Sequence, residues 1–154
     1  MFENSAEGIL VTDPAQRIER VNPAFTAITG YPATEAIGRT PALLQSGLPD
    51  DAFYRAMWSA IREQGHWQGE IWNRRRDGEI YPEFLSISEV RDESGQLNHY
   101  IATFADITQA HRAREELTYR TYHDPLTDLP NRDLFRERLE RALATETDPL
   151  ALVF

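Results

Sequence analysis

The chain has 154 residues, a formal net charge of −9 and no cysteine. The missing cysteine excludes disulfides, thiolate metal sites and the cysteinyl-flavin photochemistry of blue-light sensors, and the acidic charge argues against nucleic-acid binding because phosphates would repel it. No apolar run approaches the roughly 20 residues of a membrane helix. We therefore expect a cytoplasmic segment without membrane contact of its own, although the parent protein could carry a membrane anchor.

The first third of the sequence predicts a β-hairpin followed by short helices. The runs GILVT and RIERV, joined by DPAQ, are typical of two strands and a turn within residues 8–21. Residues 22–51 contain several prolines and glycines and short apolar pairs, which indicate two or three short helices. We expect Phe25, Ile28 and Ile37 to be buried there.

A longer helix is predicted over residues 52–65. Asp50 or Asp51 can cap its first turn, and Gly65 ends it. Apolar residues recur at helical spacing, which predicts one buried face. These residues are Phe53, Met57 and Ile61.

Three strands are predicted after this helix, at residues 67–74, 79–90 and 97–105, with an Asp77-Gly78 turn between the first two. Two strands, a helical middle and three more strands predict an α+β fold, in which a five-stranded antiparallel sheet carries helices on one face. We expect the only basic cluster, NRRRDG, to be a solvated hairpin tip. Its expected partners in weak surface ion pairs are Glu70, Glu79 and Glu83.

Two helices are predicted beyond the sheet. Asp106 can cap a helix that runs to Tyr122, whose apolar stripe is too thin for more than a marginal coiled coil. Asn131 can cap a second helix, and PLALVF at residues 149–154 reads as the start of a buried strand. The apolar face of the second helix is expected to comprise Leu134, Phe135, Leu139, Ala142 and Leu143.

Residues 1–106 resemble a PAS sensory domain, through the stretches ENSAEGILVTD, NPAFTAITGY, EAIGR and ATFADIT. The stretch HDPLTDLPNR, which opens residues 123–154, is similar to the N-terminus of GGDEF diguanylate cyclase domains. The resemblance implies a PAS fold, a signalling linker helix at residues 107–122, and a truncated N-terminal part of a GGDEF domain.

The GGDEF resemblance implies an enzyme in the parent protein but none in this chain. In that family the Mg²⁺-binding Asp follows the strand that begins here as ALVF, and the GTP-binding loop lies further on. Phosphoryl-type chemistry needs such carboxylates to hold the metal. We therefore expect no catalytic residue, no metal site and no cyclase activity here, whereas the parent should make cyclic di-GMP from two GTP.

The expected function is that of a sensory and regulatory module in a bacterial signalling protein, acting on a GGDEF domain through the linker helix. In PAS proteins the triplet that matches Asp106, Ile107 and Thr108 looks like a pivot between sheet and helix, and its Asp often pairs with a nearby Arg. We expect a homodimer, formed through the PAS domain, the linker helix or both.

The ligand is left open between FAD, another small molecule and a core filled by its own side chains. Strand parity places Trp67, Gly69 and Asn73 on one face, where the glycine could leave room for a ring and the amide could contact its edge. The chain is similar to FAD-binding PAS redox sensors of the nitrogen-fixation and aerotaxis type, which implies that Trp58 and Asn73 lie at the isoalloxazine.

The candidate pocket residues are therefore Trp58, Trp67 and Asn73. One departure from that subfamily is Pro41, which stands where a similar member has a flavin-contacting Glu. Haem is disfavoured, because haem-binding PAS domains place an axial His on the helical side of the pocket and the predicted helices there carry none.

Overall fold

The computed structural model describes residues 2–124 and 126–145. The chain divides into two compact units, residues 1–109 and residues 110–154. We describe each unit by itself.

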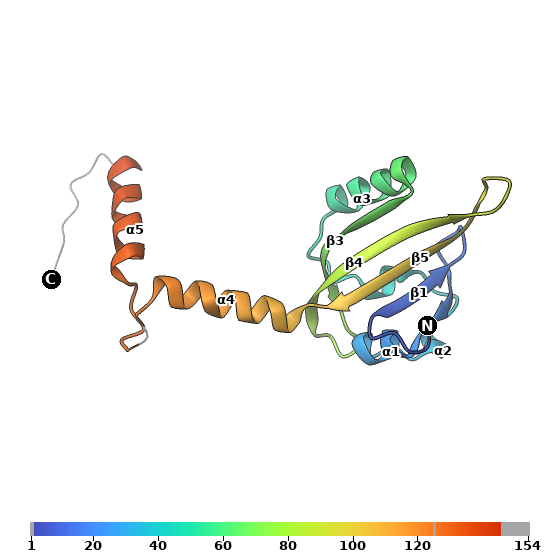
Figure 1. Ribbon diagram of the computed structural model, residues 1–154, viewed down its shortest axis with the longest axis horizontal. Helices are drawn as coiled ribbons and strands as arrows, with labels where there is room; N and C mark the ends of the chain where they lie inside the picture. Colours follow the sequence, from blue (N-terminus) through green and yellow to red (C-terminus); the bar gives the residue numbers. More distant parts are fainter. Residues whose placement is uncertain (1, 125, 146–154) are drawn as a thin grey trace. The chain divides into compact units, whose positions relative to one another are not determined.

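The first unit is built on an antiparallel sheet with the strand order β2-β1-β5-β4-β3 (Figure 1). The sheet confirms the predicted α+β fold and its five strands. The strands are β1 (Gly8–Thr12), β2 (Ile18–Val21), β3 (His66–Arg74), β4 (Ile80–Arg91) and β5 (Leu97–Asp106).

Short helices connect β2 to β3, as the prolines and glycines predicted. Asp50 caps the longest of them by accepting a hydrogen bond from the Phe53 amide at 2.8 Å, and Gly65 ends it with a φ of 78°. The helices are α1 (Pro23–Thr29), α2 (Ala33–Ala36), the 3-10 helix η1 (Pro41–Leu44) and α3 (Asp51–Gln64).

The core of this unit lies on one face of the sheet, because side chains alternate along each strand and only one set is covered. Phe25 of α1 packs edge-on against Phe104 of β5, with ring centroids 6.0 Å apart. The expected burial of Phe25 is confirmed, whereas that of Ile37 is wrong, since Ile37 is 50% exposed. Helix α2 is a single turn that buries Ala36, and the backbone leaves the helical conformation at Ile37.

Asn22 connects the start of the chain to the core through four hydrogen bonds. Its Oδ1 accepts hydrogen bonds from the amides of Ile9 (2.8 Å) and Phe25 (2.9 Å). Its Nδ2 donates to the carbonyls of Glu7 (2.9 Å) and Phe2 (3.2 Å). Because Asn22 is buried, water cannot replace these bonds when the side chain is lost.

We predict that Asn22→Ala lowers the free energy of unfolding by about 3 kcal/mol, because two amides and two carbonyls lose their partner. The matched control is Asp50→Ala, which removes an exposed cap with a single bond and should cost about 1 kcal/mol. Urea unfolding followed by tryptophan fluorescence measures both. Equal losses in the two variants would contradict the prediction.

Two further helices follow the sheet, α4 (Thr108–Tyr122) and α5 (Arg132–Thr145). Helix α4 buries no residue, and its Leu117 is 67% exposed. Asn131 caps α5 through a bond from the Leu134 amide at 3.0 Å, as predicted. The side chains of Ala142 and Leu143 and the predicted strand at 149–154 lie outside the described part. No helix among the described residues has both the length and the apolar character needed to span a membrane.

Candidate functional site

A cavity of about 190 Å³ lies between the buried face of the sheet and the helical segment. Its wall is mainly apolar and includes side chains from β1, η1, α3, β3, β4 and β5. Since one water needs only about 10–15 Å³, the cavity can hold several waters or one ring system. It is smaller than the roughly 300–1,000 Å³ pockets that enclose drug-sized ligands.

One end of the cavity wall is polar, and Glu83 is its centre. Glu83 is 1% exposed, and each of its carboxylate oxygens has a protein donor. Asn73 Nδ2 donates to Oε1 at 2.8 Å, and the Tyr81 hydroxyl donates to Oε2 at 2.6 Å. The alternation of β4 places Tyr81 and Glu83 on the inward face together with Leu85. Glu83 is therefore buried, and the expectation that it forms a surface ion pair is wrong.

Burial raises the pKa of Glu83 to about 7, because the apolar surroundings disfavour the charged form. The hydrogen bonds from Tyr81 and Asn73 oppose this rise. The same burial, together with the neighbouring carboxylate, raises the pKa of Tyr81 far above its ordinary value. The Tyr81–Glu83 pair therefore keeps the phenol protonated, while the carboxyl can gain or lose a proton near neutral pH.

Tyr54 adds a hydroxyl to the cavity wall. Within the described part of the chain this buried hydroxyl has no hydrogen-bond partner. Burial, and secondarily the charge of Glu83, raises the pKa of Tyr54. A buried hydroxyl without a partner is rare in folded proteins, and a polar atom of a ligand or a water in the cavity would satisfy it.

We predict that Tyr54→Phe leaves the free energy of unfolding of the ligand-free protein unchanged or raises it by up to about 1 kcal/mol. Tyr81→Phe, its matched control, removes a buried bond to Glu83 and should lower the free energy of unfolding by about 1–3 kcal/mol. Thermal or urea unfolding compares the two. A loss in Tyr54→Phe as large as that in Tyr81→Phe would contradict the prediction.

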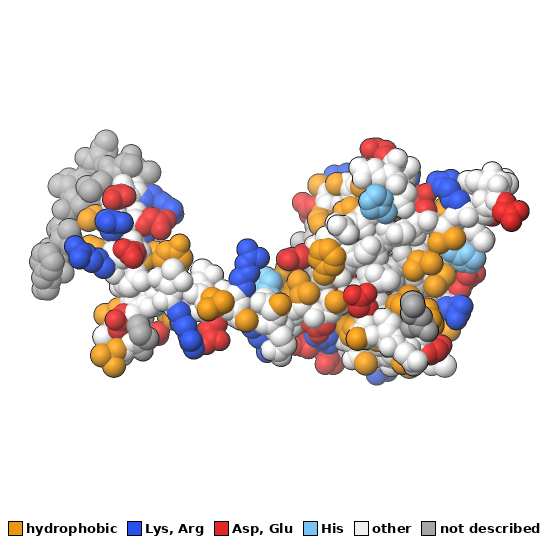
Figure 2. All heavy atoms as spheres, in the orientation of Figure 1, with side chains coloured by type: hydrophobic (Ala, Val, Ile, Leu, Met, Phe, Trp, Pro, Cys, Tyr) orange, Lys and Arg blue, Asp and Glu red, His pale blue; other side chains and the backbone are white. Residues whose placement is uncertain are grey.

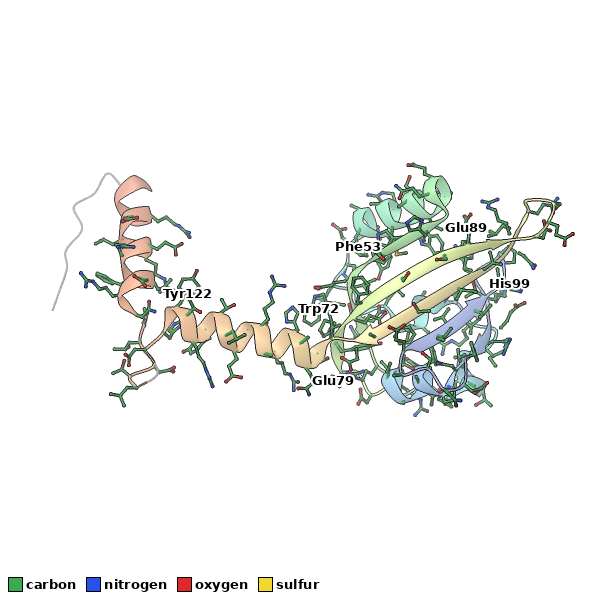
Figure 3. All side chains as sticks on the ribbon, in the orientation of Figure 1. Phe53, Trp72, Glu79, Glu89, His99 and Tyr122 are labelled. Atoms are coloured by element: carbon green, nitrogen blue, oxygen red, sulfur yellow. The ribbon has the colours of Figure 1, made fainter. Side chains whose placement is uncertain are left out.

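Two of the three residues predicted for the pocket line the cavity. Trp58 does so and packs edge-on against Tyr100, with centroids 5.5 Å apart, and Asn73 does so at the polar end. Trp67 is not among the lining residues. Its indole packs edge-on against Phe53 of α3 (labelled in Figure 3), and it fills the space beside Gly69, where an added Cβ would lie 2.8 Å from the ring.

Among the described residues, the cavity wall carries an acidic side chain without a basic one in the same wall. Within the described part of the chain, no Arg, Lys or His lines it, and Glu83 is its one ionisable carboxyl. His99 instead pairs with Glu19 on the surface (3.0 Å), and His66 is exposed. A ligand carboxylate or phosphate would meet no cation there and would be repelled by ionised Glu83. The cavity therefore fits an uncharged group.

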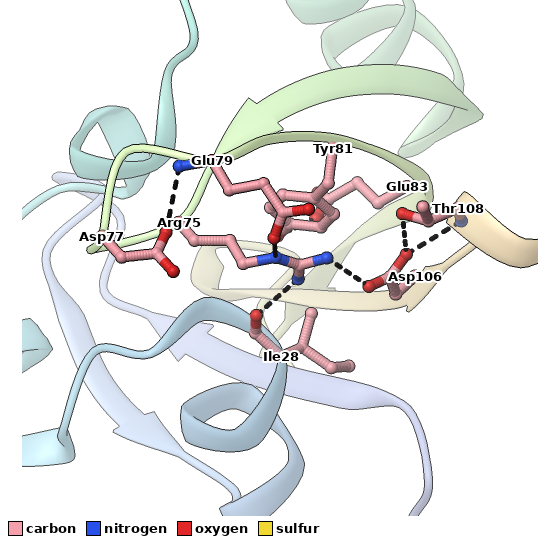
Figure 4. Close-up of polar contacts among 8 residues, drawn as sticks. All are labelled: Ile28, Arg75, Asp77, Glu79, Tyr81, Glu83, Asp106 and Thr108. Carbon is pink, nitrogen blue, oxygen red and sulfur yellow. Dashed lines mark hydrogen bonds and ion pairs between the residues drawn. The ribbon is translucent and has the colours of Figure 1, made fainter.

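A second polar cluster surrounds Arg75, just beyond the cavity (Figure 4). Its Nη2 donates to Asp106 Oδ2 at 2.6 Å, its Nε to Glu79 Oε2 at 2.8 Å, and its Nη1 to the Ile28 carbonyl at 2.6 Å. The guanidinium also lies 3.9 Å from the centroid of the Tyr81 ring, which favours a cation–π interaction. Arg75 thus joins α1, β4 and β5.

Sequence reasoning missed Arg75, because the basic cluster was expected to be solvated. The side chain of Arg75 is only 15% exposed, so this expectation is wrong for it. Arg76 beside it is exposed and pairs with Glu35. The available signal was the tendency of the Asp in the predicted pivot to pair with a nearby Arg.

The residues of the predicted pivot lie where β5 meets α4. Asp106 Oδ1 accepts hydrogen bonds from the amide (2.9 Å) and the hydroxyl (2.5 Å) of Thr108, the first residue of α4. The Ile107 amide donates to the Pro82 carbonyl at 3.1 Å. Burial works to raise the pKa of Asp106, but the hydrogen bonds from Thr108 and Arg75 outweigh it and leave the pKa below its ordinary value.

Comparison with known proteins identifies relatives over the first unit. A family model described as "PAS domain" matches residues 6–109. A nitrogen fixation regulatory protein of Klebsiella oxytoca is 32% identical over 117 residues, which is 76% of this chain and 24% of that protein. A blue-light-activated histidine kinase of Brucella canis is 36% identical over 103 residues, 65% of this chain and 21% of that protein.

Among solved structures, an RNA-binding light-oxygen-voltage receptor superposes with a TM-score of 0.69 at 32% identity, over 76% of this chain and 34% of that one. The chain spans about a quarter or less of the length of the two curated relatives. The family match ends at residue 109, so the resemblance of residues 123–154 to a GGDEF domain stays a prediction.

Proposed function

This chain belongs to the PAS domain family of sensory modules, and from that premise we propose that it detects a small ligand in its cavity and passes the signal through α4 to a diguanylate cyclase domain of its parent protein. One observation carries the proposal. Strand β5 lines the cavity with Ala102 and Phe104 and continues through Asp106 into α4, without a flexible linker. A shift of β5 would therefore move the start of the helix.

The output side rests on the GGDEF-like stretch at residues 123–132. In a homodimer, two α4 helices could bring two cyclase domains into or out of register, which is a population shift between two arrangements. Figure 2 shows hydrophobic side chains among the charged ones on the sheet face of the first unit. The exposed large hydrophobic residues of this unit include Trp72, Phe84 and Ile101, and exposed apolar side chains of this kind support dimer formation.

The test is the cyclic di-GMP output of the parent protein. One residue inserted after Thr108 would turn the rest of the helix by about 100°, so output should change strongly, and Asp106→Ala should change it as well. A residue inserted after Ser94, in the exposed loop between β4 and β5, is the control and should leave output unchanged. Unchanged output in both the insertion variant and Asp106→Ala would refute the transmission route.

A second candidate function is a flavin-based redox sensor, favoured by Trp58 and Asn73 in the wall of a cavity to which the described residues contribute no cationic group. Such a cavity suits the uncharged ring of a flavin, with Asn73 and Tyr54 as its hydrogen-bond partners and the phosphates outside. The bound flavin would supply the redox chemistry. With no cysteine in the chain, we propose no cysteinyl-flavin photochemistry, although some relatives are named as light receptors.

A visible absorption spectrum of the purified protein, before and after dithionite, decides this candidate. Flavin bands that bleach on reduction would support it, and a colourless protein that binds no added FAD would refute it. Trp58→Ala and Asn73→Ala should each weaken FAD binding at least about tenfold. Trp67→Phe is the matched control, because Trp67 lies outside the cavity wall.

A further inference from the structure

A continuous set of contacts runs from the cavity wall to the start of α4. Asn73 and Tyr81 donate hydrogen bonds to the two carboxylate oxygens of Glu83. The Tyr81 ring lies against the guanidinium of Arg75, which forms the ion pair with Asp106. Asp106 holds the first amide of α4 with its other oxygen. Of this set, Asn73 and Glu83 line the cavity, so Glu83 is the ionisable group of the set that a ligand in the cavity would contact.

The charges around Glu83 have opposing effects on it. Arg75 favours the ionised carboxyl, whereas Asp106, which stands opposite Glu83 in the register of β4 and β5, disfavours it. The titratable and charged groups that face Glu83 are Arg75 from the turn between β3 and β4, Tyr81 from β4, Asp106 from β5 and Tyr54 from α3.

We propose that Glu83 is a proton-linked positioning residue. It is ionised when the cavity holds water, and it takes a proton from solvent when an uncharged ligand fills the cavity. Its protonation tightens the Arg75–Asp106 ion pair that holds the start of α4. The proposal rests on the proposed function, because it assigns a regulatory step to the same cavity. The pivot at Asp106, Ile107 and Thr108 concerns how the signal leaves the domain. The role of Glu83 concerns what changes inside the domain when a ligand binds.

The direction of the effect follows from electrostatics. Displacing water from the cavity desolvates Glu83 further and so favours its neutral form. A neutral Glu83 no longer repels Asp106 and no longer competes for Arg75. Both changes strengthen the attraction between Arg75 and Asp106. The pKa of Glu83 near neutrality means that a modest change in solvation is enough to alter its charge.

The test follows the amide resonance of Thr108 by NMR between about pH 5 and about pH 8. His111→Gln is used as the background, which removes the one histidine in the first turns of α4. In the ligand-free protein the resonance should titrate with a midpoint near pH 7. Glu83→Gln should abolish the titration, and Tyr81→Phe should move its midpoint upward because the hydroxyl favours the ionised carboxyl. Glu79→Gln, which also removes a carboxylate from Arg75 but outside the cavity, should retain it.

Riboflavin, an uncharged flavin, is the ligand probe, and its binding is measured in the same samples by tryptophan fluorescence. Bound riboflavin should move the midpoint upward by about one pH unit. A titration that persists unchanged in Glu83→Gln would overturn the inference, and so would bound riboflavin that leaves the midpoint in place. Absence of riboflavin binding would count against the flavin candidate alone, because the ligand-free comparison of Glu83→Gln with Glu79→Gln still decides the link from Glu83 to α4.

Discussion

The free energy of unfolding should fall by about 3 kcal/mol as the pH rises from about 4.5 to about 7, and Glu83→Gln should remove this fall. The folded-state pKa of Glu83 is raised from its ordinary 4.5 to about 7, so in this window the unfolded chain has released a proton that the folded chain still holds. Stability decreases with pH wherever the folded state binds more protons. The fall is complete above the folded-state pKa, and one pKa unit corresponds to about 1.4 kcal/mol.

Urea unfolding at several pH values measures this effect. Tryptophan fluorescence reports on the first unit, because Trp58, Trp67 and Trp72 all belong to it. The control is Glu70→Gln, which neutralises an exposed carboxylate on the other face of β3 and should keep the fall. The low pKa of Asp106 does not interfere, because its contribution is lost only at pH values below this window. A wild-type curve parallel to that of Glu83→Gln would contradict the prediction.

Arg75→Ala should lower the free energy of unfolding by about 3 kcal/mol. The change leaves Asp106 Oδ2 and the Ile28 carbonyl without their donor and removes the cation from the Tyr81 ring. Breaking a partly buried ion pair by removing one partner is costly, because the remaining carboxylate stays partly desolvated and loses its cation. We also expect faster hydrogen exchange at the Thr108 amide, since Asp106 would no longer be held in place.

Arg76→Ala is the control for Arg75→Ala. Arg76 is the next residue and donates two hydrogen bonds to Glu35, at 3.0 and 2.9 Å, yet its side chain is 54% exposed. An exposed pair of this kind contributes about 0–1 kcal/mol. Similar losses for the two variants would mean that burial does not distinguish the two arginines, and the central role of Arg75 would fail.

Much of the fold was predictable because its signals are local. Asp50 and Gly65 bound α3 through hydrogen bonding and glycine geometry within a few residues, and the period of β3 placed Ile71 and Asn73 on the inward face. Ile37 was misjudged because hydrophobicity does not say where a one-turn helix ends. Trp67 was expected at the pocket, yet its ring packs beside Gly69 and against Phe53 of α3. The alternation of side chains along a strand does not predict where a neighbouring helix packs.

The sequence by itself determined the order of the elements, their caps and the inward face of β3, since these depend on neighbours along the chain. Only the tertiary structure decided which polar residues meet inside. Glu83 and Arg75 both read as surface charges in the sequence, because a charged residue is expected in water. The pairing of β4 with β3 and β5 instead buries the carboxylate against Asn73 and Tyr81, and it brings Arg75 to Asp106 across a separation of 31 residues. Such partners are fixed by sheet register and packing, which no local pattern encodes.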